Sequence, residues 1–465
     1  MKITLLWTDM MVWGLVVALL GWGWLVSRSP QVQKQWHTIF KSPVAMASAI
    51  ILLFYLSFTL LDSVHLRAYV EQKGIKNPVS QKVQYRGEMF SLLDLMFDHT
   101  LKHTERTYSA PFATHEYSKS IVVGKDDVTR QEYLPLKYVK VPSGESKDAD
   151  IAKRSLKAVV LGLSISLLLV LLHIAIKGQG TFREKLRRIR QGETELPWRT
   201  AYLTFTLLLV TFVWMYLLSY HYHVLGTDKV GGDVFYQSLK SIRTGVLIGI
   251  LTTLVMLPVS ITLGISAGFF GGWIDDAIQY IYTTLNSIPG VLLIAGAVLV
   301  MQVMMDNNPQ WFETTLERSD LRLLFLILIL GMTSWTGLCR LLRAETLKIS
   351  RVEFVTAAKA FGVSKWKIIF RHIMPNLMHI ILISVVLDFS ALVLAEAVLS
   401  YVGVGVDPTM YSWGNMINQA RLEMAREPMV WWSLFSAFIF MFILVLAANL
   451  LSDRIQKVLD PRSRP

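Results

Sequence analysis

The sequence predicts an all-α polytopic membrane protein with about nine transmembrane helices. Of its 465 residues, 53% are hydrophobic, and the mean hydropathy is +0.44. Apolar runs of about 17 residues or more recur, and helices of that length cross the roughly 30 Å hydrocarbon core of a bilayer. The single cysteine, Cys339, excludes an internal disulfide bond and any metal site built from several cysteines.

The nine spans are expected at about 10–27, 44–61, 158–176, 201–219, 244–268, 277–305, 323–339, 377–400 and 430–451. Lys and Arg distinguish the two sides of the membrane, because basic residues accumulate in cytoplasmic loops. They number 22 in segments 27–43, 177–200, 340–376 and 452–465, but five in loops 221–240, 302–320 and 401–429. We therefore expect a cytoplasmic C-terminus and an external N-terminus, with the first span kept as an anchor instead of a cleaved signal peptide.

Two polar regions interrupt the early spans. The stretch from Ser63 to about Asp150 is expected to form a small, partly ordered external domain. Its residues His99, His103, Glu105 and His115 raise the alternative of a metal site, but solvated loop histidines are far commoner, so no metal is predicted. The basic loop from Lys177 to Arg199 fits either a contact with anionic lipid headgroups or plain cytoplasmic topology, and we favour the second.

The segment from Arg351 to Asn376 lies between two apolar runs. It predicts two short helices separated at Gly362, a residue that readily takes the positive φ of a helix end. Ser364 is expected to cap the second helix, and Pro375 stands where the next span begins. Its basic residues are Lys359, Lys365, Lys367 and Arg371. Such a rigid helix–turn–helix is suited to docking, with an ordinary amphipathic connector as the alternative.

The spacing of Thr356-Ala357-Ala358, Gly362 and Pro375 resembles the EAA loop of bacterial ABC-importer permeases. In that family the loop is a coupling helix seated in a cleft of the ATPase. Thr356 stands where the family motif has Glu, so the resemblance implies docking but no ionic contact there. The ending Arg371–Asn376 is similar to the dipeptide, oligopeptide and nickel branch.

A glycine-rich turn follows the span at 201–219. Its motif residues are Leu225, Gly226, Thr227, Asp228, Gly231 and Asp233. They resemble the H-x-L-G-T-D-x-x-G-R-D-V segment of peptide permeases, with Gly232 in place of the usual Arg. Asp228 and Asp233 are expected to cap turns and helix starts. No G-x-x-x-x-G-K-[ST] sequence occurs in the chain, so we expect it not to hydrolyse ATP itself.

Four residues within the predicted spans are pathway candidates. Pro258 and Pro289 break helical hydrogen bonds and act either as hinges that line a cavity or as static kinks. Asp388 and Glu396 are carboxylates at membrane depth, which either face the pathway or are satisfied by packing. The run Leu399–Val406 and the closing Leu459-Asp460-Pro461-Arg462 also resemble the same family.

The resemblance implies a permease subunit of a peptide/nickel-type ABC importer in the bacterial inner membrane, with a type I permease core. We divide the chain into anchor spans at 1–62, an external domain at 63–150, an extra hairpin at 151–220 and the permease core at 221–465, with its coupling loop at 344–376. We favour 44–61 over 201–219 as the counterpart of the family's first span.

The implied partners are a second homologous permease, two ATPases that use ATP-Mg, a periplasmic substrate-binding protein and membrane lipids. No nucleic acid, cofactor or metal is expected on this chain. A nickel or metal-chelate importer and a membrane scaffold without transport remain alternatives. An intramembrane enzyme is disfavoured, because Asp388, Glu396 and His173 form no catalytic motif, and no catalytic residue is assigned.

Overall fold

The computed structural model describes residues 2–459 apart from 29, 70–84, 124–128, 140, 143–145, 177–180 and 313. The chain forms two compact units. The first comprises Met1–Leu5, Gly23–Thr244 and Tyr411–Leu450, and the second comprises Leu6–Trp22, Gly245–Met410 and Leu451–Pro465. Three helices contribute residues to both units, namely α1 (Trp7–Ser27), α9 (Val234–Phe270) and α18 (Trp432–Leu459).

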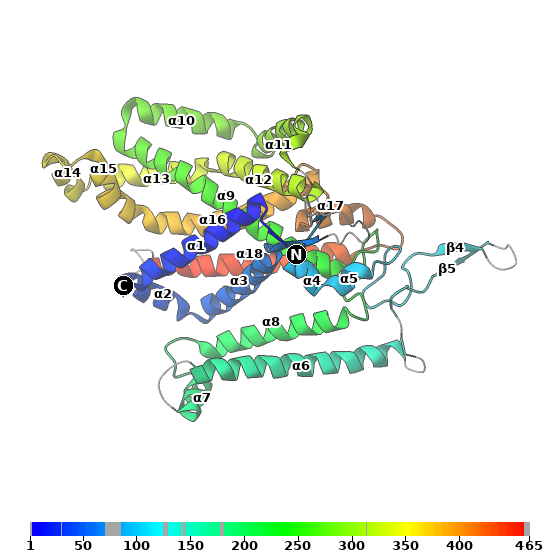
Figure 1. Ribbon diagram of the computed structural model, residues 1–465. Coiled ribbons are helices and arrows are strands. Elements are labelled where there is room, and N and C mark those ends of the chain that lie inside the picture. The colour runs from blue at the N-terminus through cyan, green and yellow to red at the C-terminus, as the bar shows by residue number, and fades with distance from the viewer. Residues whose placement is uncertain are drawn as a thin grey trace, which may run out of the picture. The chain divides into compact units, whose positions relative to one another are not determined.

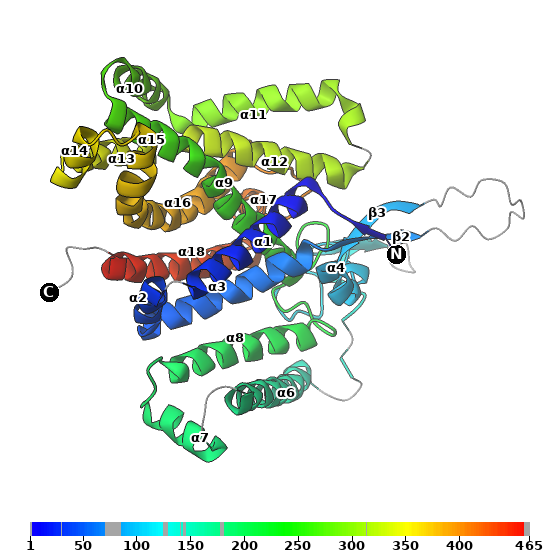
Figure 2. The ribbon, with the colours of Figure 1, turned by 60° about the vertical axis from the view of Figure 1, so that its left-hand side comes forward.

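The remaining elements belong to one unit each (Figures 1 and 2). Those of the first unit are β1 (Lys2–Thr4), α2 (Pro30–Phe40), α3 (Pro43–Asp62), β2 (His65–Tyr69), β3 (Tyr85–Ser91), α4 (Leu92–Met96), α5 (Asp98–Lys102), β4 (Ser120–Val123), β5 (Thr129–Glu132), α6 (Lys147–Ile176), α7 (Phe182–Gln191), α8 (Trp198–Leu218) and α17 (Trp413–Glu423). Those of the second are α10 (Gly272–Ser287), α11 (Gly290–Asn307), a 3₁₀ turn (Pro309–Trp311), α12 (Thr315–Ser334), α13 (Thr336–Ile349), α14 (Glu353–Ala360), α15 (Lys365–Ile368), a π-helical turn (Ile369–Ile373) and α16 (Met374–Val402).

The predicted membrane architecture is confirmed. Eight helical segments of the described chain are long and apolar enough to cross a membrane, and they coincide with eight of the nine predicted spans. The ninth, at 10–27, corresponds to α1, whose apolar stretch Trp7–Gly21 is shorter.

One predicted span is divided. The segment 277–305 consists of α10 and α11, which are separated at Ile288 and Pro289. Proline has no N–H to donate and pushes the preceding residue out of the helical region, and Ile288 accordingly has extended φ and ψ angles of −90° and 132°. Pro289 therefore stands at the N-cap of α11 instead of kinking a span, whereas Pro258 lies inside α9 as predicted.

A small antiparallel sheet ties the start of the chain to the polar region after α3, the predicted external domain. Its strand order is β1-β2-β3, with Lys2 opposite Arg67 and Leu66 opposite Phe90. The N-terminal strand and the polar region after α3 therefore lie at the same end of α3. A second hairpin, β4–β5, belongs to the same polar region.

The second unit is organised by close packing of α9 on α13. A Cβ atom at Gly264 would lie 2.8 Å from the carbonyl oxygen of Cys339, and one at Gly268 would lie 2.7 Å from that of Arg343. Small residues four positions apart allow helices to approach this closely inside a bilayer. Ser260, one turn earlier, donates a 3.0 Å hydrogen bond to the carbonyl oxygen of Trp335.

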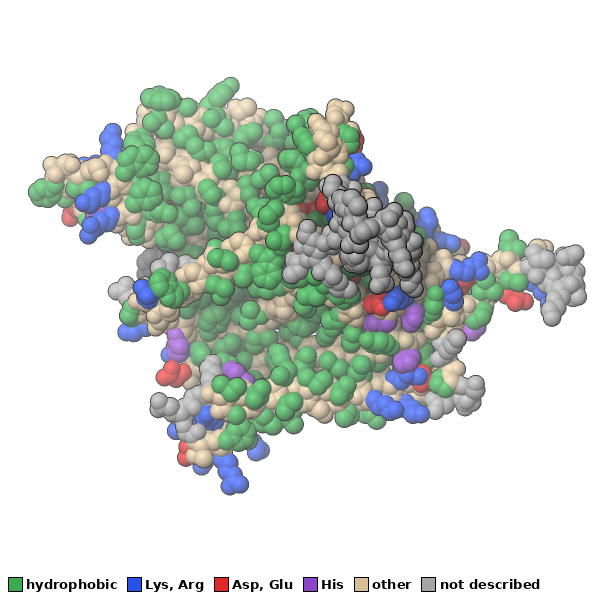
Figure 3. Space-filling model, viewed as in Figure 1, with side chains coloured by type: hydrophobic (Ala, Val, Ile, Leu, Met, Phe, Trp, Pro, Cys, Tyr) green, Lys and Arg blue, Asp and Glu red, His purple; other side chains and the backbone are tan. Residues whose placement is uncertain are grey.

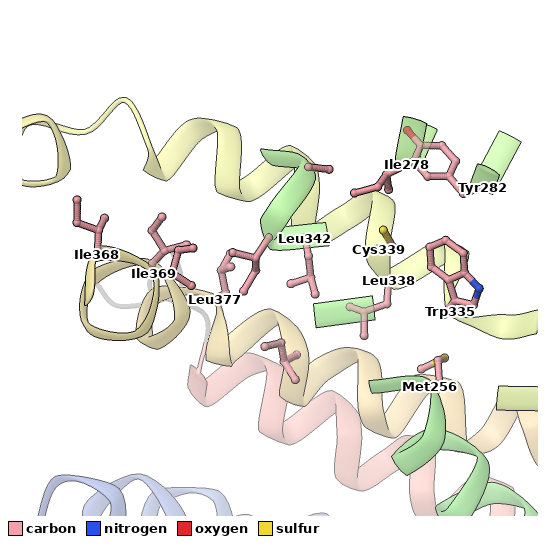
Figure 4. Close-up of a cluster of buried hydrophobic side chains, with 14 of the residues drawn as sticks. Met256, Ile278, Tyr282, Trp335, Leu338, Cys339, Leu342, Ile368, Ile369 and Leu377 are labelled. Carbon is pink, nitrogen blue, oxygen red and sulfur yellow. The ribbon is translucent and has the colours of Figure 1, made fainter. Parts of the chain in front are cut away.

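A buried apolar cluster surrounds this helix contact (Figure 4). It joins Met256 of α9 to Ile278 of α10 and to Cys339 of α13. It also includes Val355 and Ala358 of α14 and residues of α15 and α16. The predicted docking loop is thus anchored directly on the helices that it follows and precedes.

Replacing Gly264 with Val should destabilise the protein, because the added atoms overlap the α13 backbone. Overpacking of this kind typically costs about 1–3 kcal/mol, so the midpoint of thermal unfolding in detergent should fall. Gly296→Val in α11 is the matched control, since no heavy atom lies within 4 Å of a Cβ atom there. Equal midpoints for the two variants would show that the α9–α13 contact is not close.

Candidate functional site

The glycine-rich loop, which the sequence predicts to be external, is organised by Asp228. Its Oδ1 accepts hydrogen bonds from the backbone N–H groups of Val230 (3.0 Å) and Gly232 (2.7 Å), and its Oδ2 accepts one from the side-chain amide of Gln237 (2.6 Å). Gly226 and Gly231 have positive φ angles of 73° and 76°, which suit glycine. Asp228 therefore caps the turn, as the sequence predicted.

Asp233 connects this loop to α9 and to a buried histidine. One carboxylate oxygen accepts a 3.1 Å hydrogen bond from the N–H of Tyr236 and so caps α9, as predicted. The other lies 2.7 Å from Nδ1 of His223, and Nε2 of His223 lies 3.8 Å from the Glu105 carboxylate. Glu105 also accepts hydrogen bonds from the backbone N–H groups of Lys137 and Tyr138 (2.8 and 2.9 Å).

The external domain is held directly on the loop. The N–H of Thr227 donates to the carbonyl oxygen of Ser109 (3.0 Å), and the N–H of Ser109 donates to the Thr227 hydroxyl (2.6 Å). The N–H of Glu105 donates to the carbonyl oxygen of Gly231 (3.0 Å). A side chain at Gly226 would come within 2.5 Å of the Ser109 carbonyl oxygen, so this approach requires glycine.

The segment before α18 completes this external site. Trp432 is buried and donates from Nε1 to the carbonyl oxygen of Thr227 (2.9 Å). Tyr117 of the external domain packs edge-on against the Trp432 ring and donates its hydroxyl to the carbonyl oxygen of Met429. Arg426 lies 5.5 Å above the Tyr108 ring. Two segments that are distant in sequence, Glu105–Tyr117 and Arg426–Trp432, therefore enclose the Leu225–Asp233 loop.

Charged partners set the protonation of this site at neutral pH. Burial alone would lower the pKa of His223, but the hydrogen bonds and charges of Asp233 and Glu105 outweigh it and raise the pKa to about 9. Burial likewise opposes ionisation of Glu105, but the neighbouring His223 and the hydrogen bonds from two backbone N–H groups hold its pKa below the usual range. His223 is therefore a cation between two carboxylates at pH 7.

A second polar cluster ties α4 to the first turns of α9. Tyr236 donates a 2.6 Å hydrogen bond to Asp94, and Lys240 forms an ion pair with the same carboxylate. Asp62, at the end of α3, lies 3.9 Å from the Lys240 amine. Burial opposes the charge on Asp94, but Lys240 holds its pKa below the usual range. Sequence reasoning missed this cluster, since its carboxylates stand outside every motif.

The docking loop has the predicted break at Gly362, whose φ is +71°. The N–H of Val363 donates to the carbonyl oxygen of Ala358 (3.1 Å), which closes the end of α14. Thr356 and Ala357 are exposed, whereas Ala358 is buried against the unit's core. The predicted side-chain cap by Ser364 is wrong, because its hydroxyl makes no capping hydrogen bond in the structure.

The second short helix of the loop is not separate from the next span. Helix α15 passes through the π-helical turn into α16 without a break, and Pro375 lies in the first turn of α16, where a missing N–H is tolerated. The second half of the loop and the next span therefore form one continuous helical segment.

Large aromatic side chains cover the outer surface of the docking loop. Phe361 is 85% exposed and Trp366 is 66% exposed, and Phe354 and Phe370 are also exposed. Sequence reasoning stressed the basic residues instead. Two of these turn back onto the end of α9, where Lys359 lies 4.9 Å above the Phe269 ring and Lys365 lies 5.6 Å above Phe270.

The intramembrane carboxylates differ in environment. Glu396 is buried and accepts a 2.7 Å hydrogen bond from Ser400 one turn later, which favours a packing role. Asp388 is half-buried, and among the described residues no hydrogen-bond or ion-pair partner is found for it. Asp388 thus fits the predicted pathway role better than Glu396 does.

The residues considered for a metal site are not brought together. His99 stacks on Tyr220 at 3.7 Å between ring centroids, and His103 stacks on Tyr138 at 4.6 Å. Glu105 instead binds His223. No metal-binding group of His, Cys, Asp and Glu side chains is present within the described residues.

The closing motif at Asp460–Arg462 lies outside the described residues.

Raising the pH should weaken the external site. The raised pKa of His223 means that its stabilisation is complete below about pH 6.5 and is lost as the pH rises through about 9. His223→Gln should therefore lower the free energy of unfolding at pH 7 by up to about 3 kcal/mol, and the thermal midpoint should fall with it. At pH 10 the same substitution should have little effect on the midpoint. The exposed residue His115 provides the control, His115→Gln. A deficit of His223→Gln that persists unchanged at pH 10 would contradict the assignment.

Comparison with known proteins identifies the family. Residues 260–465 match the model of the family described as binding-protein-dependent transport system inner membrane component. The chain is 32% identical over 240 residues to the glutathione transport system permease protein GsiD of Pectobacterium atrosepticum, covering 52% of this chain and 73% of GsiD. It is 32% identical to the oligopeptide permease protein OppC of Mycobacterium bovis (52% and 77% covered) and 31% identical to the dipeptide permease protein DppC of Bacillus subtilis (52% and 69% covered).

Among solved structures, an inward-facing conformation of the MetNI methionine ABC transporter matches 47% of this chain and 93% of that chain, with 17% identity and a TM-score of 0.35. The matches to GsiD, OppC and DppC cover more than two thirds of each relative. The chain belongs to the family of inner membrane components of binding-protein-dependent transport systems.

Proposed function

We propose that this protein is one of two permease subunits of an ATP-driven importer for peptides or peptide-like compounds. The named relatives are permeases for oligopeptides, dipeptides and glutathione, which favours peptides over a nickel or other metal chelate. The observation that carries the proposal is the exposed aromatic surface of the docking loop, which is anchored in the core and continuous with the span α16.

The docking loop is the coupling site for the ATPases. Phe361 and Trp366 are the most exposed aromatic residues of the loop, and large exposed aromatics of this kind are frequent anchors of protein interfaces. Thr356, Ala357 and Ala358 stand at the family's motif, and the Thr356 hydroxyl is already used by the carbonyl oxygen of Glu353 (2.9 Å). Apolar contacts, and not an ion pair at Thr356, therefore hold the ATPase.

The energy for transport comes from the partner subunits. Two ATPases bind and hydrolyse ATP-Mg, and their closure moves the docking loops of both permeases. Because α15 continues into α16, that movement reorients the pathway between inward-open and outward-open states. Pro258 in α9 and the break at Pro289 supply points at which the helices bend.

The substrate-binding protein docks on the external site. One unit contains all the parts of this site, namely the glycine-rich loop, the segment from Glu105 to Tyr117 and the Met429–Trp432 segment. The N-terminal strand β1 belongs to the same unit. A groove of about 940 Å³ beside the β4–β5 hairpin, lined by Tyr117, Lys119 and Tyr133, lies on the same domain. The pairing of β1 with the sheet of this domain supports an N-terminus on the same side as the domain.

Purification of the tagged chain in mild detergent tests the proposal as a whole. We expect a second permease and two ATPases to accompany it, with ATP turnover that rises when one periplasmic binding protein is added. A chain that carries no ATPase under any detergent condition would instead favour a membrane scaffold.

Phe361→Glu should weaken the binding of the ATPases to the docking loop, because a charged side chain replaces an apolar anchor. Loss of such an anchor typically costs about 2 kcal/mol, or about 30-fold in affinity, and we expect a matching loss of uptake. Trp311→Glu in the 3₁₀ turn Pro309–Trp311 alters an aromatic residue that is 43% exposed and serves as the control. The coupling assignment fails if Phe361→Glu retains ATPase and uptake at the level of this control.

The two intramembrane carboxylates should respond differently to neutralisation. Asp388→Asn is expected to reduce uptake without lowering the thermal midpoint, because no partner in the described chain is lost. Glu396→Gln is expected to change the midpoint, since Glu396 is buried and hydrogen-bonded to Ser400. Uptake that is normal in Asp388→Asn would remove this residue from the pathway.

A further inference from the structure

Helix α7 lies at the turn of a membrane hairpin. Helices α6 and α8 are long and apolar enough to cross a membrane, and they lie side by side. Ser166 and Thr206 are joined by a 2.7 Å hydrogen bond, and His173 near the end of α6 bonds Tyr202 near the start of α8 (2.8 Å). Because α7 connects these adjacent ends, it sits where both helices leave the hydrocarbon (Figures 1 and 2).

One face of α7 is apolar and uncovered. Phe182, Leu186 and Ile189 are spaced at i, i+4 and i+7, so they share one side of the helix. Phe182 is 40% exposed and Leu186 is 43% exposed, and no residue of α7 is buried. The described chain thus leaves this face open.

The rest of α7 is strongly basic. It carries Arg183, Lys185, Arg187, Arg188 and Arg190. Its single acid, Glu184, forms a capping box with Thr181 at the helix start. Figure 3 shows Lys and Arg side chains gathered at the end of the hairpin, beyond the hydrophobic surface of α6. Within the described residues, Arg183, Arg188 and Arg190 have no ion-pair partner.

The helix is held at a defined place relative to α6. The Lys185 amine points at the carbonyl oxygens of Ile174 and Ala175 (3.4 Å each) at the end of α6. The Thr181 capping box and Gly192, with φ of +77°, define the two ends of α7. Its orientation is therefore set by the hairpin, and it does not hang from a free linker.

We propose that α7 lies in the membrane surface, with its apolar face among the lipid chains and its arginines on anionic phospholipid headgroups. An amphipathic helix with a narrow apolar face and a cationic remainder has the character of an interfacial helix. Free phosphate or nucleic acid would use the arginines but would leave the apolar face in water. A bilayer surface satisfies both faces at once, and the adjoining spans already place it there. The inference does not depend on what the transporter carries.

The test uses the full-length protein in lipid nanodiscs. Cys339 is buried, so Leu186→Cys supplies the accessible thiol for an environment-sensitive fluorophore. Discs contain phosphatidylcholine alone or a mixture with phosphatidylglycerol, with a trace of headgroup nitroxide lipid as quencher. We expect stronger quenching and a shorter emission wavelength in phosphatidylglycerol discs, with the difference reduced by salt, because ions screen the attraction.

Substitutions separate charge from structure. In the same labelled background, changing Arg183, Arg187 and Arg190 together to Gln should weaken surface binding by about a hundredfold, since each basic residue contributes about fivefold near an anionic surface. The phosphatidylglycerol content needed for half-maximal quenching should rise accordingly. The matched control changes the same three residues to Lys, which keeps the charge and should keep the binding. Unchanged gel-filtration profiles verify the fold of each variant.

Several outcomes would overturn the proposal. They are equal quenching in the two lipid compositions, no effect of the Gln substitutions, and loss of quenching in the Lys control, which would indicate arginine-specific contacts with a protein. A fluorescence change produced by inorganic phosphate in phosphatidylcholine discs would point to a free-anion site. A change that appears only when ATPase subunits are added would assign α7 to a protein interface.

Discussion

The close approach of α9 to α13 is the contact on which the second unit depends. Lipid chains are as apolar as the side chains they surround, so helices inside a bilayer gain little by hiding apolar surface from each other. They associate through van der Waals contact, and Gly264 and Gly268 bring the α9 surface against the α13 backbone. The cluster formed there also contains Val355 and Ala358. The docking loop therefore shares one packed core with this helix contact.

The polar region of the first unit is held together by different forces. Hydrogen bonds and ion pairs, with His223 between Asp233 and Glu105, fasten the polar domain onto the glycine-rich loop. Buried polar groups of this kind are stable only when each finds its partners, and here the backbone supplies several of them. We therefore expect this site to respond to pH, whereas the α9–α13 contact rests on the van der Waals approach of Gly264 and Gly268 to the α13 backbone.

Local features of the sequence were predicted well. The correct predictions include the spans, the positive φ of Gly362, the capping roles of Asp228 and Asp233 and the place of Pro375. Each of these features depends on the residue type at that position and on its near neighbours in the sequence. The errors were also local. Ser364 was expected to cap a separate helix, but α15 runs on into α16, and the break at Pro289 divided a segment that apolar content alone joins.

The sequence by itself determined that the chain spans a membrane, where its turns lie and which family its motifs resemble, because span length and turn chemistry belong to short stretches of chain. Only the tertiary structure decided which partner each polar group takes. Glu105 and His223 are separated by more than a hundred residues, and no spacing in the sequence links them. The same folding separated Glu105 from the histidines beside it in sequence, since His99 and His103 stack on tyrosines instead. A polar side chain near the membrane must find a partner, and chain topology determines which partners are within reach.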